Sequence, residues 1–499
     1  MIPVFTPAQV RDMDARAFER GTTSAALMER AAGHLARGVA ALAGRSYGLR
    51  VAILCGKGNN GGDGLAAGRR LLARGAAPVV CLVAGEDRLG DDGARELARY
   101  RATGGRLTGS VDAALDGADV AVDCLLGTGA SGAPRPPYAE AVRALRDSRA
   151  PVVACDLPSG VDADTGRVPG EAVRADLTVT LGAHKRGLWL WPARGHVGRV
   201  VLGDLGIADG TEPVASVLEA ADVGRLLQPP RADAHKRTRG VVVVLAGSPG
   251  MAGAAILCAR GALAGGAGLV TLATGDPGLA TAAVPEALTA RVDPDAEAAF
   301  DLVAGLIEGA DALAIGPGLG RAEGTVGLVR RLVREVDVPL VLDADGLNAF
   351  RGEGDALADH RCPLLVLTPH AQEFGRLVGS SGHGVWGQRA TLVPEVAAKW
   401  GAVVVAKGPS SLVAAPDGRT WVNPTGSAAL ATGGTGDVLT GLVTALVAQD
   451  ASAERVAAAV YLHGLAGEEA GRRGAVRSVT ALDVAAAVPA ALRTIGVAG

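Results

Sequence analysis

Short runs of apolar residues alternate with longer segments of helical periodicity along most of the chain. In the N-terminal part the apolar runs are Val51–Leu54, Val79–Val83, Val120–Cys124, Val152–Cys155, Leu177–Leu181 and Val200–Leu202. Strand-like runs separated by helical segments predict parallel pairing through right-handed crossovers. The pattern therefore indicates a doubly wound sheet.

Two helices are predicted before the first of these runs. Thr6 is a suitable N-cap, Pro7 fits the first helical position, and Gln9 completes a capping box. The segment Ser24–Leu42 follows, and helical spacing places Leu27, Met28, Ala31, Leu35 and Val39 on one face.

The alternation stops between Ile207 and Arg239, which we interpret as an interdomain region, and then restarts. The later strands are expected at Val241–Leu245, Leu269–Leu272, Ala312–Ile315, Leu340–Leu342, Leu364–Leu367, Val403–Val405 and Leu412–Ala414. Helices are expected at Ala252–Ala264, Thr325–Glu335, Ala371–Val378, Asp437–Ala448 and Ala453–Ala466. We therefore expect two doubly wound α/β domains of three layers each, at residues 1–215 and 222–499.

Composition narrows the class of protein. The 499 residues exceed the ~150 residues of a typical domain about threefold. A formal charge of −3 gives no electrostatic case for binding nucleic acid or an anionic membrane. No apolar run reaches the ~18 residues of a membrane span, and no secretory signal is evident at the N-terminus. The six cysteines form no C-x-x-C pair, so we expect a cytoplasmic protein with reduced core thiols.

The first strand ends in a glycine-rich loop, Gly56–Gly64. Its glycines satisfy G-x-G-x-x-G loosely, and Glu86, at the expected end of the next strand, could bind a ribose. The loop also contains Asn59, Asn60 and Asp63, which a dinucleotide fingerprint does not need. The side-chain oxygens of these three residues favour a polar ligand together with a hard cation. The structural alternative is a tight turn with Asp63 as a helix N-cap.

Two further loops follow strands of the same predicted sheet, at Asp123–Gly132 and Asp156–Asp162. Ligands bind at the carboxyl ends of strands in open parallel sheets. We therefore expect Asp63, Asp123 and Asp156 to belong to one site.

With these loops, this part of the chain resembles the Rossmann-like epimerase domain of bifunctional NAD(P)H-hydrate repair enzymes. The resemblance implies that Asn59, Asn60, Gly61, Gly62 and Asp63 contact the hydrated nucleotide, as do Gly127, Thr128, Gly129, Ala130, Ser131, Gly132 and Ala133. It implies substrate contact for Asp156 as well. It also implies potassium binding by Asn60, Asp123 and Ser159.

The substrate of such an epimerase carries a hydroxyl at C6, next to the ring nitrogen. This centre can invert by loss and re-addition of water or by ring opening, and both routes need a proton donor and acceptor. We expect Asp156 to act in this role; the rival interpretation gives Asp156 a positioning role and the proton transfer to Asp63.

The second domain carries several signals at its expected strand ends. Gly433–Asp437 opens a long apolar helix, so backbone N–H groups and the helix dipole can bind phosphate while Asp437 accepts a hydroxyl proton. Glu373 follows His370 by three residues and could hold Mg²⁺. Lys407–Ser411 offers a cation and hydroxyls to a phosphate. No Walker sequence occurs, so the domain is not a P-loop protein.

This domain resembles the ribokinase-like NAD(P)H-hydrate dehydratases from about Arg231 to Val488. The resemblance implies that Ala254, Gly318, His370 and Asp437 contact the hydrated nucleotide. It implies an adenine-nucleotide site made by Lys407, Gly408, Pro409, Ser410, Ser411 and Gly436, with ADP as co-substrate. Asp437 would deprotonate the C6 hydroxyl, the hydroxyl would attack the terminal phosphoryl group of ADP, and phosphate would then leave from C6.

The expected partners are NADHX, NADPHX and ADP, with K⁺ in the first domain and Mg²⁺ in the second, and we expect a homo-oligomer without nucleic acid or membrane partners. Three alternatives remain open from the sequence. They are a vitamin-type kinase fused to a nucleotide-binding regulatory domain, a dehydrogenase built on Gly56–Gly61, and a non-enzymatic scaffold.

Overall fold

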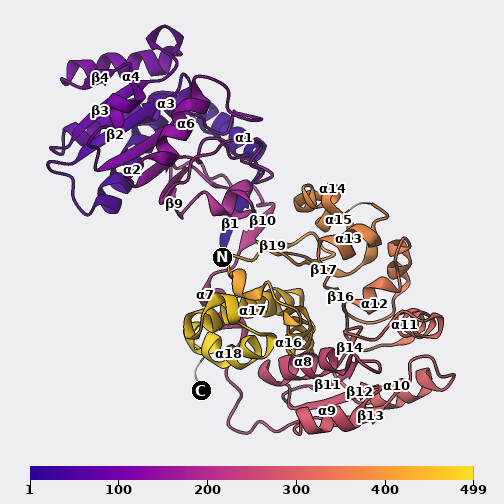
Figure 1. Cartoon of the computed structure of the whole chain (residues 1–499). Coiled ribbons are helices and arrows are strands. Elements are labelled where there is room, and N and C mark those ends of the chain that lie inside the picture. Colours follow the sequence, from indigo (N-terminus) through magenta and orange to yellow (C-terminus); the bar gives the residue numbers. More distant parts are fainter. Residues whose placement is uncertain (381, 498–499) are drawn as a thin grey trace. The chain divides into compact units, whose positions relative to one another are not determined.

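The computed structural model describes residues 1–380 and 382–497 (Figure 1). The chain forms two compact units. One comprises residues 2–215, and the other comprises Met1 and the chain from Ser216 onward. We call them the N-terminal and C-terminal units.

The N-terminal unit is built on seven parallel strands in the order β4-β3-β2-β5-β6-β7-β9. Their bounds in chain order are β2 Arg50–Cys55, β3 Ala77–Leu82, β4 Arg106–Thr108, β5 Val120–Cys124, β6 Val152–Cys155, β7 Leu177–Leu181 and β9 Arg199–Gly203. Two shorter strands, β1 (Ile2–Phe5) and β8 (His184–Lys185), pair in parallel with each other.

Helices cover both faces of this sheet. They are α1 Pro7–Glu19, α2 Ser24–Ala43, α3 Asn59–Leu72, α4 Asp91–Ala102, α5 Val111–Leu115 and α6 Tyr138–Asp147, with short 3₁₀ turns at η1 Glu86–Arg88, η2 Arg186–Trp189 and η3 Ala193–Gly195. Successive residues of β2 enter different cores. Val51 and Ile53 pack with residues of α2, α3 and α4, whereas Ala52 and Leu54 pack with residues of α5 and α6. This alternation gives the expected three layers.

The C-terminal unit has a larger sheet in the order β13-β12-β11-β14-β15-β16-β17-β18-β19, with β10 beside β19. The bounds are β10 Ala215–Val217, β11 Val241–Leu245, β12 Leu269–Thr274, β13 Leu288–Arg291, β14 Ala312–Ile315, β15 Leu340–Leu342, β16 Leu365–Leu367, β17 Val403–Ala406, β18 Leu412–Ala414 and β19 Thr420–Val422. Pairing is parallel from β13 to β17 and antiparallel from β17 through β19.

The helices of this unit include two long apolar ones, α16 and α17, whose residues dominate its largest core cluster. The full set is α7 Ala220–Leu226, α8 Ala252–Ala264, α9 Pro277–Ala283, α10 Ala299–Ile307, α11 Glu323–Glu335, α12 Asp345–Asn348, α13 Ala371–Leu377, α14 Gly382–Trp386, α15 Arg389–Trp400, α16 Thr435–Gln449, α17 Ala453–Arg473 and α18 Ala481–Thr494, with 3₁₀ turns η4 Gly354–Asp359, η5 Ala428–Leu430 and η6 Val476–Ser478.

The α/β prediction is confirmed, and so is the capping box at Thr6, Pro7 and Gln9. The division between the two units, after Ala215, lies within Ile207–Arg239, the stretch interpreted as an interdomain region. This stretch contains β10 and α7. The three-residue strand was not recognisable from its own sequence, because its pairing with β19 involves residues about two hundred positions away, Ser216 opposite Trp421.

The seven-stranded sheet and the parallel run from β13 to β17 each reverse their strand order at one point, and ligands bind at such points in open α/β sheets. In the N-terminal unit the reversal lies between β2 and β5, where Gly56 N donates to Cys124 O at 2.9 Å. In the C-terminal unit it lies between β11 and β14, where Gly247 N donates to Pro317 O at 2.9 Å. The glycine loops singled out from the sequence therefore meet at the two reversal points.

Candidate active sites

A cavity of about 650 Å³ opens at the reversal point of the N-terminal unit. Of the residues predicted for this site, it is lined by Asn59, Asn60, Asp63, Gly127, Thr128, Gly129, Ala130 and Asp156. Sequence reasoning did not assign a role to five other polar residues that line it, Asp14, Ser24, Lys57, Tyr138 and Lys185.

Gly61 and Gly62 serve the packing of α3. A Cβ at Gly61 would lie 1.9 Å from Gly56 O, and a Cβ at Gly62 would lie 2.6 Å from Met28 Cε. Both backbone N–H groups donate to Gly58 O, at 2.9 and 3.2 Å. Contacts of these glycines with a nucleotide stay a prediction, as do those of the exposed Ser131, Gly132 and Ala133.

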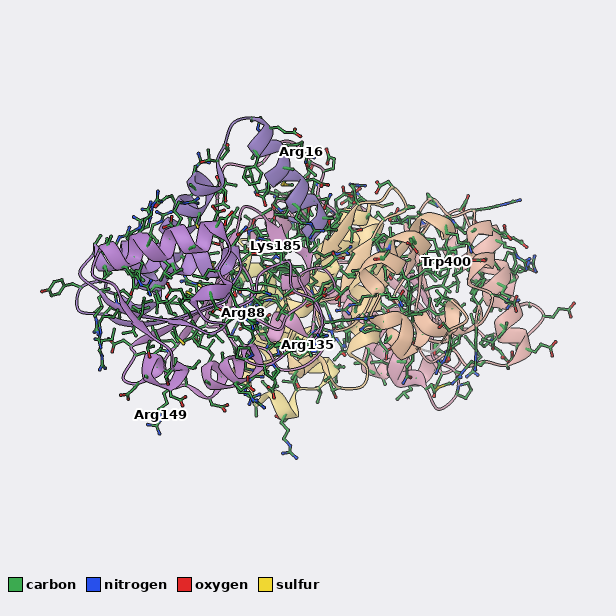
Figure 2. The ribbon with its side chains drawn as sticks, turned by 90° about the horizontal axis from the view of Figure 1, so that it is seen from above. Arg16, Arg88, Arg135, Arg149, Lys185 and Trp400 are labelled. Atoms are coloured by element: carbon green, nitrogen blue, oxygen red, sulfur yellow. The ribbon has the colours of Figure 1, made fainter. Side chains whose placement is uncertain are left out.

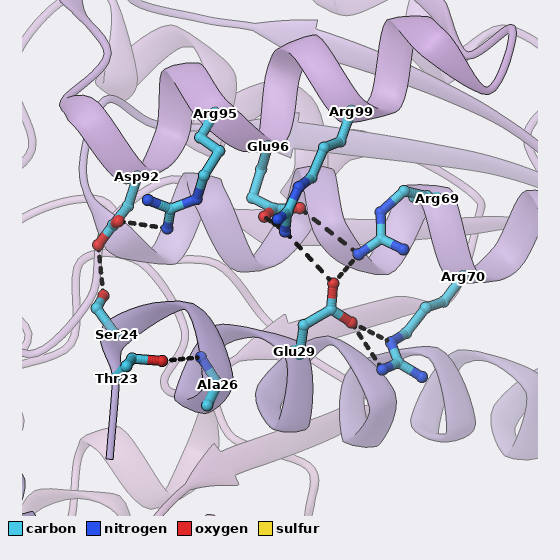
Figure 3. A network of polar contacts seen from close by, with 10 residues as sticks. All are labelled: Thr23, Ser24, Ala26, Glu29, Arg69, Arg70, Asp92, Arg95, Glu96 and Arg99. Carbon is cyan, nitrogen blue, oxygen red and sulfur yellow. Dashed lines mark hydrogen bonds and ion pairs between the residues drawn. The ribbon is translucent and has the colours of Figure 1, made fainter. Parts of the chain in front are cut away.

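An ion network holds the helix that carries Asn59–Asp63 (Figure 3). Glu29 of α2 accepts hydrogen bonds from Arg69 and Arg70 of α3, with Arg70 Nη2 2.7 Å from Glu29 Oε2. The buried Glu96 of α4 accepts from Arg99 Nη1 at 2.7 Å and lies 3.6 Å from Arg69. The network ties α2, α3 and α4 together behind the glycine loop.

Asp156 and Lys185 form a buried ion pair in the cavity wall. The Lys185 side chain is 1% exposed, in contrast to Arg149, whose side chain projects from the ribbon (Figure 2). Asp156 has a backbone φ of +68°, which non-glycine residues adopt rarely and at a cost of about 1–3 kcal/mol. Such strain is concentrated at functional sites, and here it follows directly on the last residue of β6.

The structural alternative that made Asp63 a helix N-cap was wrong. Asp63 is the fifth residue of α3, and Gly58 is the N-cap. Burial raises the pKa of Asp63 well above its ordinary value, and the nearby Asp156 and Glu96 raise it further. Burial also raises the pKa of Asp14. The cavity thus contains two carboxyl groups whose pKa is raised by burial.

Two of the three residues implied for potassium, Asp123 and Ser159, are hydrogen-bonded to each other. Ser159 Oγ donates to Asp123 Oδ1 and Ser159 N donates to Asp123 Oδ2, both at 2.7 Å. Burial raises the pKa of Asp123 to about 6. Within the described part of the chain, neither side-chain polar atom of the buried Asn60 has a hydrogen-bond partner. An unsatisfied buried amide oxygen fits a ligand that supplies positive charge.

The sequence interpretation of Glu86 was wrong. Strand β3 ends at Leu82, and Glu86 begins the 3₁₀ turn η1, where its carboxylate accepts two hydrogen bonds from Arg101, at 2.7 and 2.6 Å. An exposed carboxylate held by arginine outside the cavity cannot serve as the ribose ligand of a dehydrogenase.

In the C-terminal unit, the loop after β11 and the loop after β14 lie against each other. Ser248 N donates to Gly318 O at 2.7 Å, and a Cβ at Gly318 would lie 3.0 Å from Ala254 Cβ. The structure therefore brings the predicted residues Ala254 and Gly318 together. Gly318 has a φ of +60°, which glycine adopts without strain.

Lys407 lies at the centre of a second group. Its ammonium donates to Asp343 Oδ1 at 2.6 Å, and Asp343 Oδ2 accepts from Thr440 Oγ1 of α16 at 2.7 Å. A Cβ at Gly436 would lie 3.4 Å from Lys407 Nζ. The predicted phosphate-binding lysine and the first turn of α16 are therefore adjacent, and Asp343 connects them.

Asp437 is the third residue of α16, and Gly434 is the N-cap. Burial and the neighbouring Asp343 raise the pKa of Asp437 to about 7, although Lys407 lowers it. A carboxylate with a pKa near the working pH is suited to general base catalysis. The buried His463 of α17 contacts the first turn of α16, since its Nε2 donates to Thr435 O at 2.9 Å.

His370 caps α13. Its Nδ1 accepts from Gln372 N and Glu373 N, and Glu373 Oε2 accepts from His370 N at 2.9 Å. Lys407 N donates to Pro369 O at 2.8 Å, which sets this cap beside Lys407. The second carboxylate oxygen of Glu373, Oε1, lies 3.4 Å from His370 Nε2.

The segment from Lys407 to Ser411 forms a tight turn between β17 and β18. Ser411 Oγ accepts from Gly408 N at 3.2 Å and donates to Gly408 O at 2.9 Å, and Ser410 has a φ of +54°.

In the part of the chain that the structure describes, no group of three or more histidine, cysteine or acidic residues could hold a metal ion. Over the same residues, no helix is long and apolar enough to cross a membrane.

Comparison with known proteins gives a match for each unit. Residues 242–490 match the family model described as NAD(P)H-hydrate dehydratase, and residues 24–187 match the model described as YjeF-related protein N-terminus. The bifunctional NAD(P)H-hydrate repair enzyme of Salinibacter ruber is 41% identical over 98% of this chain and 95% of its own length. That of Moorella thermoacetica is 39% identical over 89% and 88%.

The chain belongs to the family of bifunctional NAD(P)H-hydrate repair enzymes. Among solved structures, the ADP/ATP-dependent NAD(P)H-hydrate dehydratase of Bacillus subtilis, co-crystallised with ATP and Mg²⁺, is 33% identical with a TM-score of 0.50. The match covers 56% of this chain and 99% of that one. A ribokinase-like protein of Enterococcus faecalis, 24% identical with a TM-score of 0.50, supports the fold of the C-terminal unit.

Within this repair-enzyme chain, sequence reasoning left the roles of Asp343 and Lys185 unassigned. Both lie in strings that resemble the family, Leu342–Asp345 and Gly182–Lys185, so a signal was present. Their partners are 64 and 29 residues away, which no local spacing reveals.

Proposed function

We propose that this protein epimerises R- and S-NAD(P)HX and dehydrates S-NAD(P)HX to NAD(P)H at the expense of ADP, giving AMP and phosphate. Residues 1–215 form the epimerase domain, and residues 222–499 form the dehydratase domain. The observation that carries the proposal is the placement of Asp437, with its raised pKa, in the first turn of α16 beside Lys407 and Asp343. Helix N-terminus, lysine and base are the parts that phosphoryl transfer needs.

In the dehydratase domain, Ala254, Gly318, His370 and Asp437 contact the hydrated nucleotide. The adenine nucleotide is held by the turn Lys407–Ser411 and by Gly436. Support comes from the adjacency of Ala254 to Gly318 and of Gly436 to Lys407. The serine hydroxyls and backbone of the turn and the ammonium of Lys407 are donors of the kind that phosphate oxygens accept.

Asp437 removes the proton of the C6 hydroxyl, whose oxygen attacks the terminal phosphorus of ADP and displaces AMP. The C6–O bond then breaks, phosphate carries away the electron pair, and the ring nitrogen lone pair stabilises the positive charge. The proton on C5 then passes to solvent, and its bonding electron pair forms the C5–C6 double bond of NAD(P)H. Phosphorylation converts a poor leaving group into a good one, which explains a kinase-like fold in a dehydratase.

Magnesium is proposed for this domain, with Glu373 as its protein ligand. Carboxylate oxygens are what Mg²⁺ takes from proteins, usually one or two of them together with water and substrate phosphates. Burial raises the pKa of Glu373, and a bound cation would favour its ionised form. When bound, the ion would neutralise charge on the transferred phosphoryl group.

In the epimerase domain, Asn59–Asp63, Gly127–Ala133 and Asp156 contact the substrate. Potassium is proposed between Asn60, Asp123 and Ser159, which offer oxygen ligands only. The unpartnered buried amide of Asn60 and the hydrogen bond between Ser159 and Asp123 support this choice of residues. The ion would fix the two loops that begin at Asp123 and Asp156 against the glycine loop.

The test is to incubate the full chain with an epimer mixture of NADHX, ADP and Mg²⁺ and to follow recovery of the NADH absorbance. Complete recovery supports both activities, and recovery of the S epimer alone supports only the dehydratase. A kinase with a regulatory domain would instead consume ATP with a vitamin-type alcohol and would recover no NADH. A cytoplasmic location and a homo-oligomeric state stay predictions from the sequence.

A further inference from the structure

The Lys185 ammonium in the epimerase cavity has no hydrogen left for a substrate. It donates to Asp156 Oδ1, to Leu181 O at 2.5 Å and to Thr180 Oγ1 at 3.3 Å. An ammonium group has three donors, and all three are used. Lys185 is therefore a fixed positive charge beside Asp156 and not a group that exchanges protons with a ligand.

Asp156 keeps one oxygen unused. Its Oδ1 accepts from Lys185 and from Leu181 N at 3.0 Å, whereas no described residue donates to Oδ2. A buried carboxylate paired with an ammonium stays ionised, because the pair offsets the cost of removing the charge from water. Asp156 thus presents an ionised carboxylate with a free oxygen to the cavity that it lines.

Asp63 has the opposite environment in the same cavity. Its carboxyl group forms no hydrogen bond or ion pair with any residue that the structure describes, and the residue is 9% exposed. The charged groups around the cavity are Asp14 from α1, Lys57 from the glycine loop, Asp156 after β6 and Lys185 from β8, with Glu96 of α4 close to Asp63. Lys57 is exposed and Lys185 is committed to Asp156, so an uncharged carboxyl group is favoured at Asp63.

We propose that Lys185 is a positioning residue that holds Asp156 ionised as the proton acceptor of the epimerase, and that Asp63 is its proton donor. The proposal rests on the epimerase function proposed above. From the sequence, one carboxyl group was expected both to donate and to accept the proton, and here the two roles belong to two carboxyl groups. Pairs of titratable groups held in opposite protonation states are the usual arrangement for acid and base roles.

The chemical step balances with these two groups. Asp63 gives its proton to the C6 hydroxyl, the C6–O bond breaks with its electron pair on oxygen, and water leaves as the ring nitrogen lone pair forms a double bond to C6. Water then adds to the other face of C6, and its proton goes to Asp156. One proton has moved from Asp63 to Asp156, and exchange with solvent restores the starting state.

Infrared difference spectra at neutral pH test the protonation states directly. Comparing the full chain with Asp63→Asn should show loss of one carboxylic acid C=O band, and comparing it with Asp156→Asn should show loss of an ionised carboxylate band. In Lys185→Met, Asp156 should gain a carboxylic acid band, because its charge is no longer offset. Loss of an ionised band in Asp63→Asn would overturn the assignment. So would loss of an acid band in Asp156→Asn.

Kinetics provide the second readout. Lys185→Met should lower kcat of epimerisation about 10²-fold or more with little change in KM, as expected when a base is lost. Lys399→Met is the matched control, since Lys399 pairs with Asp355 at an exposed site of the other unit and its loss should change nothing. A folded Lys185→Met protein with wild-type kcat would contradict the positioning role. If this variant does not fold, the spectra of the two Asn variants still decide.

Failure of the proposed function gives a different result. The wild-type chain could fail to interconvert the epimers while the infrared bands behave as described. The ionised Asp156 and the protonated Asp63 would then be supported, and NAD(P)HX would be the wrong substrate. If the wild type epimerises NADHX but the bands are reversed, the function stands and the division of roles is wrong.

Discussion

Lys407 and Asp343 are 64 residues apart in the chain, and the lysine ammonium donates to the carboxylate at 2.6 Å in a buried pair. The other oxygen of Asp343 accepts from Thr440. One carboxylate therefore links the ends of β15 and β17 to the first turns of α16, which carry Asp437. The lysine proposed to bind phosphate and the aspartate proposed as the base are therefore both influenced by Asp343.

Asp343→Asn should destabilise the C-terminal unit strongly. It leaves Lys407, whose side chain is 17% exposed, without its counter-charge, and breaking a buried pair in this way costs about 3–5 kcal/mol. Chemical denaturation measures the loss in unfolding free energy. The matched control is Asp355→Asn, because the Asp355–Lys399 pair has the same chemistry with side chains 69% and 60% exposed. That change should cost far less, because exposed ion pairs contribute little to stability. Equal losses of unfolding free energy in the two variants would show that burial of the Asp343–Lys407 pair does not increase its contribution to stability.

Asp437→Asn should abolish dehydration and spare nucleotide binding. The amide keeps the shape of the side chain but cannot accept the hydroxyl proton, and loss of a general base costs about 10²–10⁴-fold in rate. Turnover with S-NADHX and ADP gives the rate, and calorimetry with AMP gives the affinity. A variant that keeps more than about a tenth of wild-type turnover would contradict the base role. Loss of AMP binding would instead mark Asp437 as structural.

The pH dependence of dehydration should follow Asp437. Its pKa is raised to about 7, chiefly by burial, and the base acts in its ionised form. The free-enzyme profile of kcat/KM should therefore reach a plateau above about pH 7 and fall about tenfold per pH unit below it. In Asp343→Asn a negative neighbour is removed, so the inflection should move to lower pH. An inflection near pH 4 in the wild type, or one that does not move in the variant, would refute this origin.

Potassium should support epimerisation and leave dehydration unaffected. Asp123→Ala removes the carboxylate that Ser159 contacts through both its backbone N–H and its hydroxyl, and we expect slower epimerisation with unchanged S-NADHX turnover. The two rates are measured in potassium salts and in salts of a bulky organic cation. The cation hypothesis fails if the variant and the wild type epimerise equally fast in both media.

Local sequence was enough to predict the loops that lie at the ends of strands and open helices. The glycine loop at Gly56–Gly64 and the turn before Asp437 were found because strand, glycines and helix follow one another directly. Lys185 and Asp343 take their roles from partners on other strands, so spacing alone could not assign them. Glu86 was misread because β3 ends earlier than its apolar run suggested and Arg101 of the next helix binds the carboxylate.

The most direct test of a two-site repair enzyme is the fate of each NADHX epimer in matched single-site variants. With ADP and Mg²⁺ present, the wild type should convert both epimers to NADH. Asp156→Asn should convert S-NADHX at the wild-type rate and R-NADHX no faster than the epimers interconvert spontaneously. Asp437→Asn should equilibrate the two epimers and form no NADH. Rapid conversion of R-NADHX by Asp156→Asn, or NADH formation by Asp437→Asn, would contradict the assignment of one activity to each unit.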